Sequence, residues 1–136
     1  MGPPRGVVRA HAWLYRRSGG RLLRRMGGQP VLLLTTTGRR SGRERTTPVQ
    51  YAEAGDQLVI VASNGGAPTP PAWYLNLLAD PHVHVQRGGE RLSLRAREAT
   101  GPERERLWAR LTAANRWLGP AEERARRRLP VVVLHQ

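Results

Sequence analysis

Short apolar runs separated by polar turns dominate the chain after residue 30. The run at 31–37 is rich in leucine and threonine and is bounded by Pro30 and Gly38, which predicts a buried strand. Similar runs predict strands at 44–51, 58–62, 82–86, 91–96 and 130–134. Gly88 and Gly89 separate the fourth and fifth of these runs and are a strong hairpin signal. About six short antiparallel strands favour a small closed or split β-barrel.

Three segments carry helical signals. A short helix is expected at 72–79. Thr100 followed by Glu103 is a capping-box pattern, and the next apolar residues recur at helical spacing. Pro120 can open a further short helix that ends near Leu129. Helices that cover a barrel make the predicted fold class mainly β, of the α+β type.

The first thirty residues have a different pattern. Aromatic and leucine positions, among them Trp13, Tyr15 and Leu22, alternate with arginines and are interrupted at Gly19 and Gly20. We therefore predict an amphipathic helical segment at 1–30 and a barrel domain at 31–136. The basic segment could rest on an anionic membrane surface, or it could simply cover the barrel.

Composition narrows the possible chemistry. The chain has no cysteine, which excludes disulfides, thiolate metal sites and a thiol nucleophile, so redox chemistry would need a cofactor. No apolar run is long enough to span a bilayer and no secretion signal is recognisable, so a cytoplasmic protein is expected. The formal charge of +13 comes from arginine without lysine. Such a field attracts phosphates, nucleic acid or anionic lipid, although a G- and C-rich genome would also raise the arginine content.

The loop between the first two predicted strands is a candidate anion site. Its residues Arg39, Arg40, Ser41 and Gly42 combine guanidinium groups, a hydroxyl and a flexible backbone, and Arg45 lies just inside the next strand. These groups suit a phosphate through charge-assisted hydrogen bonds. The alternative is a solvated arginine hairpin.

A second candidate cluster follows the third predicted strand, at 62–66. Two glycines there allow the backbone to approach a flat ring, and Ser63 and Asn64 offer hydrogen-bonding groups at its rim. Trp73 could wall such a pocket and Asn76 could bind the ligand or a loop. Alternatively, Trp73 is a core residue and Asn76 ties a helix to a loop.

These motifs together resemble one known family, the deazaflavin-dependent nitroreductases and quinone reductases, which are actinobacterial enzymes that use coenzyme F420. The resemblance runs in register over about residues 12–135 and rests on Leu33–Gly42, Arg45, Pro48, 62–66, 71–77, 79–81, 83–86 and 130–133. It implies a split β-barrel of the flavin-reductase type. It also implies a cofactor site formed by Arg39, Arg40, Ser41, Gly42, Arg45, Thr47, Pro48, Ala62, Ser63, Asn64, Gly65, Gly66, Trp73 and Asn76, with the phosphate and acidic tail near the arginines.

The activity implied by the resemblance is hydride transfer from the reduced coenzyme to a quinone, an enone or a nitroaromatic acceptor. Ser63 is the implied catalytic hydrogen-bond donor, and Gln50 and Trp117 stand where related members have acceptor-pocket residues. Related members often have lysine where this chain has Asn64, which bears on cofactor affinity. The resemblance does not identify which of these acceptors is the physiological one.

Other possibilities remain at this point. Flavin mononucleotide would also use an arginine-rich phosphate site, and a basic barrel could bind nucleic acid or a membrane surface. Few aromatic residues lie on the predicted strands, so nucleic acid is not expected. His82 and His84 share a strand face but have no third ligand nearby, so no metal is expected. A monomer and a homodimer are both compatible with the sequence, as is a peripheral position on the inner face of the membrane.

Overall fold

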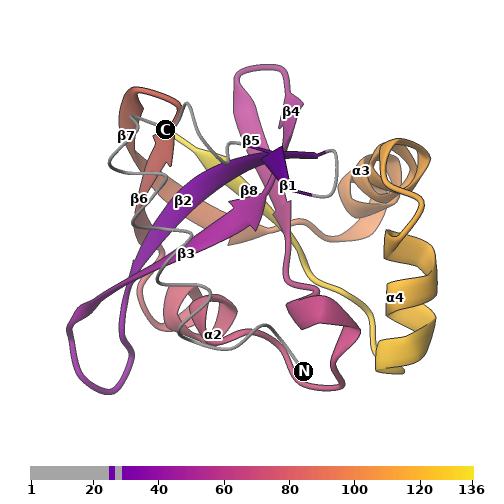
Figure 1. Ribbon diagram of the computed structural model, residues 1–136, viewed down its shortest axis with the longest axis horizontal. Helices are drawn as coiled ribbons and strands as arrows, with labels where there is room; N and C mark the ends of the chain where they lie inside the picture. Colours follow the sequence, from indigo (N-terminus) through magenta and orange to yellow (C-terminus); the bar gives the residue numbers. More distant parts are fainter. Residues whose placement is uncertain (1–24, 27–28) are drawn as a thin grey trace.

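The computed structural model describes residues 25–26 and 29–136 and consists of a curved antiparallel sheet with helices at one end and one side (Figure 1). The strands are β1 (Arg25–Met26), β2 (Gln29–Thr37), β3 (Glu44–Gln50), β4 (Ala52–Ala54), β5 (Gln57–Val61), β6 (His82–Arg87), β7 (Glu90–Glu98) and β8 (Val131–His135). The helices are the 3-10 turn η1 (Asn64–Gly66), α2 (Ala72–Ala79), α3 (Gly101–Ala114) and α4 (Leu118–Ala125).

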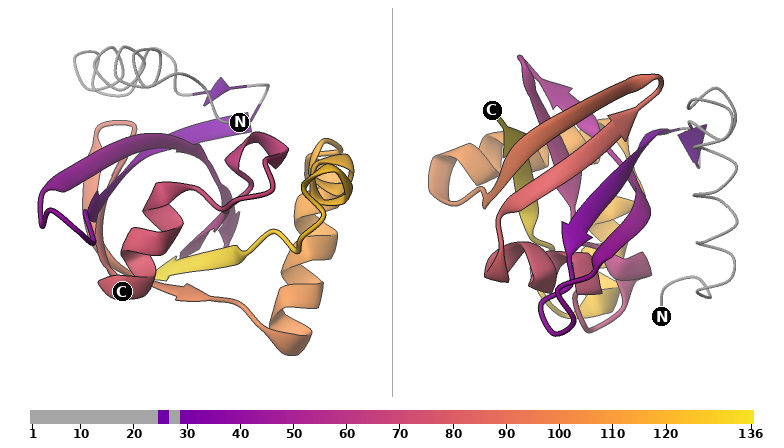
Figure 2. Two further views of the ribbon diagram at one scale, coloured as in Figure 1. Left: turned by 90° about the horizontal axis from the view of Figure 1, so that it is seen from below. Right: turned by 90° about the vertical axis from the view of Figure 1, so that its left-hand side faces the viewer.

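The strands follow the order β1-β2-β6-β7-β8-β5-β4, and β3 pairs with β2 outside this path. All of these pairs are antiparallel. The sheet curves around its core, as the left view of Figure 2 shows, but no hydrogen-bonded ladder joins β3 to β5 or β4 among the described strands. The predicted mainly β, α+β class is therefore confirmed, and the strands do not form a closed barrel.

The strand order brings two separate loops to one end of the sheet. Four successive antiparallel pairings lead from β2 through β6, β7 and β8 to β5, so β2 and β5 run in the same direction. The β2–β3 loop at 38–43 and the η1 turn both follow the carboxyl ends of those strands. The two motifs that the sequence singled out consequently lie at the same end of the sheet, where α2 also lies (Figure 1).

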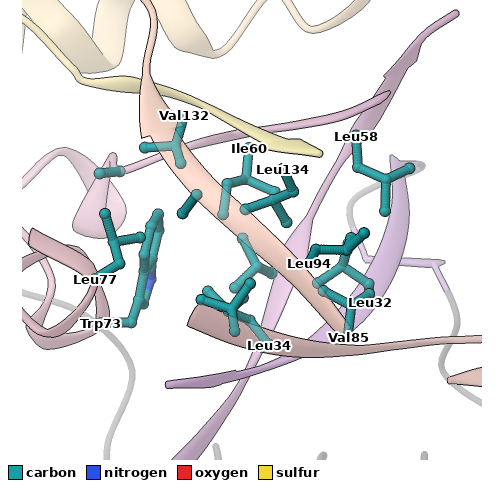
Figure 3. Packing of buried hydrophobic residues seen from close by; sticks show 14 residues of the cluster. Leu32, Leu34, Leu58, Ile60, Trp73, Leu77, Val85, Leu94, Val132 and Leu134 are labelled. Carbon is teal, nitrogen blue, oxygen red and sulfur yellow. The ribbon is translucent and has the colours of Figure 1, made fainter. Parts of the chain in front are cut away.

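The concave face of the sheet holds the main hydrophobic core (Figure 3). Alternate residues of the strands point into it, and Trp73 and Leu77 of α2 cover one end. The buried members are Leu32, Leu34, Val49, Leu58, Ile60, Ala62, Trp73, Leu77, Val83, Val85, Leu94, Ala96, Val132 and Leu134. Burying side chains of this size contributes about 1.5–3 kcal/mol each, and this contribution stabilises the curvature of the sheet.

Strand β8 is buried on both faces. Val132 and Leu134 point into the main core, whereas Val131 and Val133 join a second cluster with Leu111 of α3 and Leu118 of α4. This double burial explains why the last strand reads as an uninterrupted apolar run.

The six predicted strands and three predicted helical segments are all present, with local differences. Between the second and third predicted strands, Ala52–Ala54 forms an additional short strand, β4. Helix α4 spans Leu118–Ala125 rather than beginning at Pro120 and ending near Leu129, because Arg126 adopts a left-handed conformation that ends it.

The predicted capping box does not form. Thr100 is the N-cap of α3 but makes no side-chain hydrogen bond there. The Glu103 carboxylate instead accepts two bonds from the Arg97 guanidinium, at 2.6 and 2.8 Å. This bidentate pair joins β7 to α3 and lowers the pKa of Glu103.

Part of the predicted N-terminal helical segment is strand. Arg25–Met26 pairs with Gln29 and Pro30, because the chain reverses there to enter β2. The remainder of the segment, 1–24 and 27–28, lies outside the described residues.

A partly buried ion pair joins helices α3 and α4 to the segment before β8. The Arg104 guanidinium donates to the Glu122 carboxylate at 3.2 Å and to the Leu129 carbonyl at 3.1 Å, and it stacks over the Trp108 ring at 5.0 Å. The same Glu122 oxygen accepts the Leu129 N–H at 2.9 Å. Residues of α3, α4 and the approach to β8 thus share one polar connection.

This connection predicts that Glu122→Ala lowers the free energy of unfolding by about 1.5–3 kcal/mol, because it leaves a buried guanidinium without its carboxylate. Urea denaturation followed by circular dichroism would measure the change. Glu123→Ala is the matched control, because Glu123 is the exposed neighbour on the same helix. Equal effects of the two substitutions would show that the ion pair contributes nothing.

Candidate functional site

The β2–β3 loop is tightly closed on itself. The Gly38 N–H donates to the Arg43 carbonyl at 2.7 Å and the Gly42 N–H donates to the Gly38 carbonyl at 2.8 Å. The Ser41 hydroxyl accepts the Arg43 N–H at 3.1 Å. A β-carbon at Gly38 would lie 2.7 Å from the Ser41 hydroxyl and 3.1 Å from the Arg43 carbonyl, so a larger residue would require the Ser41 side chain and the turn to shift.

Asn76 attaches this loop to helix α2. Its side chain is buried, and its carbonyl oxygen accepts both the backbone N–H of Arg39 at 3.1 Å and the Arg39 guanidinium at 3.3 Å. Its amide donates to the Thr36 hydroxyl at 3.2 Å. Of the two roles considered for Asn76, the helix-to-loop connection is therefore the one observed.

Three further arginines of the loop and of β3 point to solvent. Arg40, Arg43 and Arg45 are exposed, and none forms an ion pair with a carboxylate in the described part of the chain. Their positive charges are thus available to a ligand. A dianionic group such as a phosphate is the chemistry that such a cluster attracts.

The register of β3 separates its predicted site residues into two groups. Arg45 pairs with Thr36 and Thr47 pairs with Leu34, so both lie on the face of the sheet that carries the main core. Pro48 pairs with Leu33 and lies on the opposite face. The structure therefore brings Arg45 and Thr47 together but does not bring Pro48 to the same face.

The η1 turn depends on left-handed backbone. Asn64, Gly65 and Gly66 have φ values of 48°, 67° and 81°. The Asn64 amide donates to the Thr69 carbonyl at 3.0 Å, so this side chain binds its own loop. Ala62, just before the turn, is completely buried, whereas Ser63 is partly exposed and makes no cap bond through its hydroxyl.

A single arginine that the sequence did not single out holds the loop after β5. The Arg127 guanidinium donates to the carbonyls of Ala62, Ser63, Ala67 and Thr69 at 3.1–3.3 Å. Burial lowers the pKa of Arg127. Because Arg127 lies 60 residues beyond its partners in a run of arginines, no local sequence signal identifies it.

Trp73 and Tyr74 occupy different environments. Trp73 is buried in the main core, so of the two roles considered for it, that of a core residue is the one observed. The Tyr74 hydroxyl donates to the Glu98 carboxylate, and burial together with this bond raises the pKa of Tyr74 to about 12. Tyr74 is thus neutral at physiological pH and joins α2 to the end of β7.

The two predicted acceptor-pocket residues are linked through Asn115. The Asn115 amide donates to the Gln50 carbonyl oxygen at 3.4 Å, and the Trp117 N–H donates to the Asn115 carbonyl oxygen at 3.2 Å. The Trp117 ring is 41% exposed, with the Arg124 guanidinium 5.8 Å from its centroid. The Asn115 side chain thus connects Gln50, at the end of β3, to the backbone of Trp117, the N-cap of α4.

Each of the two histidines of β6 has a side-chain hydrogen-bond partner. His82 bonds to Asp80 and His84 to Ser93, each at 3.1 Å. No group of three potential metal ligands occurs within 25–26 and 29–136.

The family model that matches this sequence, over residues 7–136, is that of F420H(2)-dependent quinone reductase. The F420H(2)-dependent quinone reductase Rv1261c of Mycobacterium tuberculosis is 41% identical over 133 residues, which cover 94% of this chain and 89% of that protein. A solved F420-H2 dependent reductase, FDR-A, superposes with a TM-score of 0.71 at 37% identity and covers 78% of this chain and 94% of that chain.

Two further solved structures are similar. One, described as a domain-swapped dimer, has a TM-score of 0.72 at 34% identity and covers 93% of this chain and 99% of its own. An FAD-binding protein from Mesorhizobium loti shares only the fold, with a TM-score of 0.51 at 16% identity over 76% of this chain and 78% of that chain.

The contacts of Arg127 predict that Arg127→Ala lowers the free energy of unfolding by about 1.5–3 kcal/mol and speeds hydrogen exchange at the Gly66 and Ala67 amides. Arg127→Lys should give a partial loss, because an ammonium group lacks the planar fork that reaches several carbonyls. Urea denaturation and exchange followed by mass spectrometry would measure both effects. Arg128→Ala, at an exposed neighbour, is the control; unchanged exchange in Arg127→Ala would contradict the proposed anchoring.

Proposed function

Because the chain belongs to the family of F420H(2)-dependent quinone reductases, we propose that it is an oxidoreductase that transfers a hydride from reduced coenzyme F420 to a quinone. The observation that carries this proposal is the group of exposed arginines at the β2–β3 loop, which have no ion-pair partner in the described part of the chain. Family membership gives these charges a specific ligand. The alternatives of a flavin mononucleotide enzyme and of a nucleic-acid module are not favoured.

The residues present fit an anionic coenzyme. We assign the phosphate and acidic tail to Arg39, Arg40, Ser41, Gly42 and Arg45, since these supply guanidinium groups and a closely approachable backbone. We assign the ring to Thr47, Ser63, Asn64, Gly65 and Gly66. Pro48, on the opposite face of the sheet, and the completely buried Ala62 would only support the strand and the turn. Trp73 and Asn76 would support the site without forming its surface. Trp73 is packed in the core, and Asn76 binds the β2–β3 loop.

When bound, the reduced deazaflavin supplies the hydride. The role of the chain is to orient both reactants and to stabilise the charge that develops on the acceptor oxygen. The Ser63 hydroxyl makes no cap bond in η1, so it can donate to that oxygen. Gln50 and Trp117 would hold the flat acceptor, one through an amide and the other through an exposed ring.

We further propose that the curved sheet is a split β-barrel of the flavin-reductase type. The interrupted ladder between β3 and β5 and the fold-level likeness to an FAD-binding protein support this description. A homodimer is the assembly we propose, because a related solved chain forms a domain-swapped dimer.

The cofactor assignment predicts that Arg40→Ala combined with Arg45→Ala weakens the binding of coenzyme F420 by about 1.5–3 kcal/mol for each lost charge-assisted bond. Equilibrium titration followed by deazaflavin fluorescence would measure the affinity. Flavin mononucleotide should be titrated in parallel, against the wild type and the double variant.

The matched control is Arg91→Ala combined with Arg95→Ala, which removes the same charge from exposed positions of β7. Equal losses in the two double variants would mean that only net charge attracts the coenzyme. If the wild type bound neither flavin, the proposed reductase function would be wrong.

No described helix is both long and apolar enough to cross a membrane. We propose that residues 1–30 bring the protein to an anionic membrane surface, where a lipid-soluble quinone would be available. Trp13→Ser combined with Leu14→Ser should then lower binding to vesicles that contain phosphatidylglycerol, measured by co-sedimentation. Vesicles of phosphatidylcholine alone are the control, and unchanged binding of the double variant to anionic vesicles would contradict the proposal.

A further inference from the structure

The guanidinium of Arg124 lies against the backbone of the η1 turn. A β-carbon built on Gly66 would be 3.1 Å from the Arg124 Nε and 3.4 Å from its Nη2. Gly66 is buried and has a φ of 81°, and the side of this residue that would carry a β-carbon faces Arg124 and Ala121 of helix α4. The glycine thus makes room for a positively charged group at the edge of the turn.

The Trp117 ring also contacts the Arg124 guanidinium. The Arg124 Cζ is 5.8 Å from the ring centroid, within the range of a cation–π contact. Arg124 itself is exposed and forms no ion pair with a described carboxylate. The guanidinium is thus in contact with two neutral neighbours, which do not neutralise its charge.

The η1 turn lacks a cation of its own. Asn64 is neutral and its amide is bound to Thr69. The nearby Arg127 directs its guanidinium to the carbonyls of the loop. Arg124 is consequently the described residue that combines a free positive charge with contact to this turn.

Arg124 also adjoins the residues assigned to the acceptor. Trp117 is linked through Asn115 to Gln50, so the guanidinium lies between the proposed ring site at Gly66 and the proposed acceptor wall. With the ring and the acceptor bound as assigned above, a group in this place would lie near both reactants. Preorganised charge has its largest effect on the reaction at such a position.

We propose that Arg124 stabilises the oxyanion that forms on the quinone during hydride transfer. This inference rests on the function proposed above. In this step the hydride that leaves a C–H bond of the reduced coenzyme would form an O–H bond at one carbonyl oxygen of the quinone. The displaced π electrons would pass through the quinone ring to the opposite carbonyl oxygen, which becomes the oxyanion. The resulting hydroquinone monoanion then takes a proton from water, while the coenzyme is left in its oxidised form.

The test compares Arg124→Gln and Arg124→Lys with the wild type and with the control Arg91→Gln, which removes one exposed charge from β7. The first readout is equilibrium binding to the protein with oxidised coenzyme F420 present. The probes are 2-hydroxy-1,4-naphthoquinone, which is an anion at neutral pH, and neutral 1,4-naphthoquinone. The second readout is kcat/KM for reduction of the neutral quinone.

We expect Arg124→Gln to weaken binding of the anionic probe about tenfold to a hundredfold and to lower kcat/KM by a similar factor. Binding of the neutral probe and of the coenzyme should stay unchanged. Arg124→Lys should retain part of both properties, because it keeps the charge but loses the planar stacking on Trp117. Arg91→Gln should behave as the wild type.

Equal affinity of wild type and Arg124→Gln for the anionic probe would overturn the proposal, as would a loss confined to coenzyme affinity or to thermal stability. If Arg124→Gln does not fold, the wild type alone is tested by comparing its affinities for the anionic and the neutral probe. Equal affinity for the two probes would also overturn the proposal. A wild type that binds no coenzyme would instead contradict the proposed function, so the two failures are distinguishable.

Discussion

The irregular backbone at one end of the sheet has to find hydrogen-bond partners outside any strand ladder. Besides Ser41 and Asn64 within the loops themselves, two side chains from elsewhere supply such bonds: the Asn76 amide at the β2–β3 loop and the Arg127 guanidinium at the loop after β5. Both come from segments distant in sequence from the loops that they bind. Buried polar groups of this kind are costly when unpaired, so the shape of the candidate site depends on these few bonds being made together.

The arginines of the described chain fall into two physical classes. Arg104 and Arg127 are partly or fully buried, and their guanidinium groups are committed to carbonyls or to Glu122. Arg40 and Arg45 are exposed and have no carboxylate partner among the described residues. The high net charge therefore does not act as one uniform field. Buried contacts occupy some of the arginines, and the exposed ones include the group at the β2–β3 loop, where an anion would bind.

The sheet could be predicted because its signals are local. Alternation, glycine turns and the run at 130–134 each depend on residues close in sequence, and the corresponding strands are present. Contacts between distant segments could not be predicted in the same way. No local pattern indicates that Arg127 bonds to carbonyls some 60 residues earlier in the chain. Nor does one indicate that Glu103 bonds to Arg97 instead of capping its helix. Trp73 shows the same limit, because an aromatic residue beside a glycine-rich loop can equally fill the core.

The position of β8 has a consequence for how the chain is made. This strand lies between β7 and β5 in the sheet, yet it follows every other described strand in the sequence. The β2–β3 and β6–β7 hairpins can form on the ribosome from local contacts, but the two halves of the sheet cannot be joined until 131–135 has left the exit tunnel. Until then the nascent chain exposes two unprotected strand edges, a state in which chaperones would be most useful.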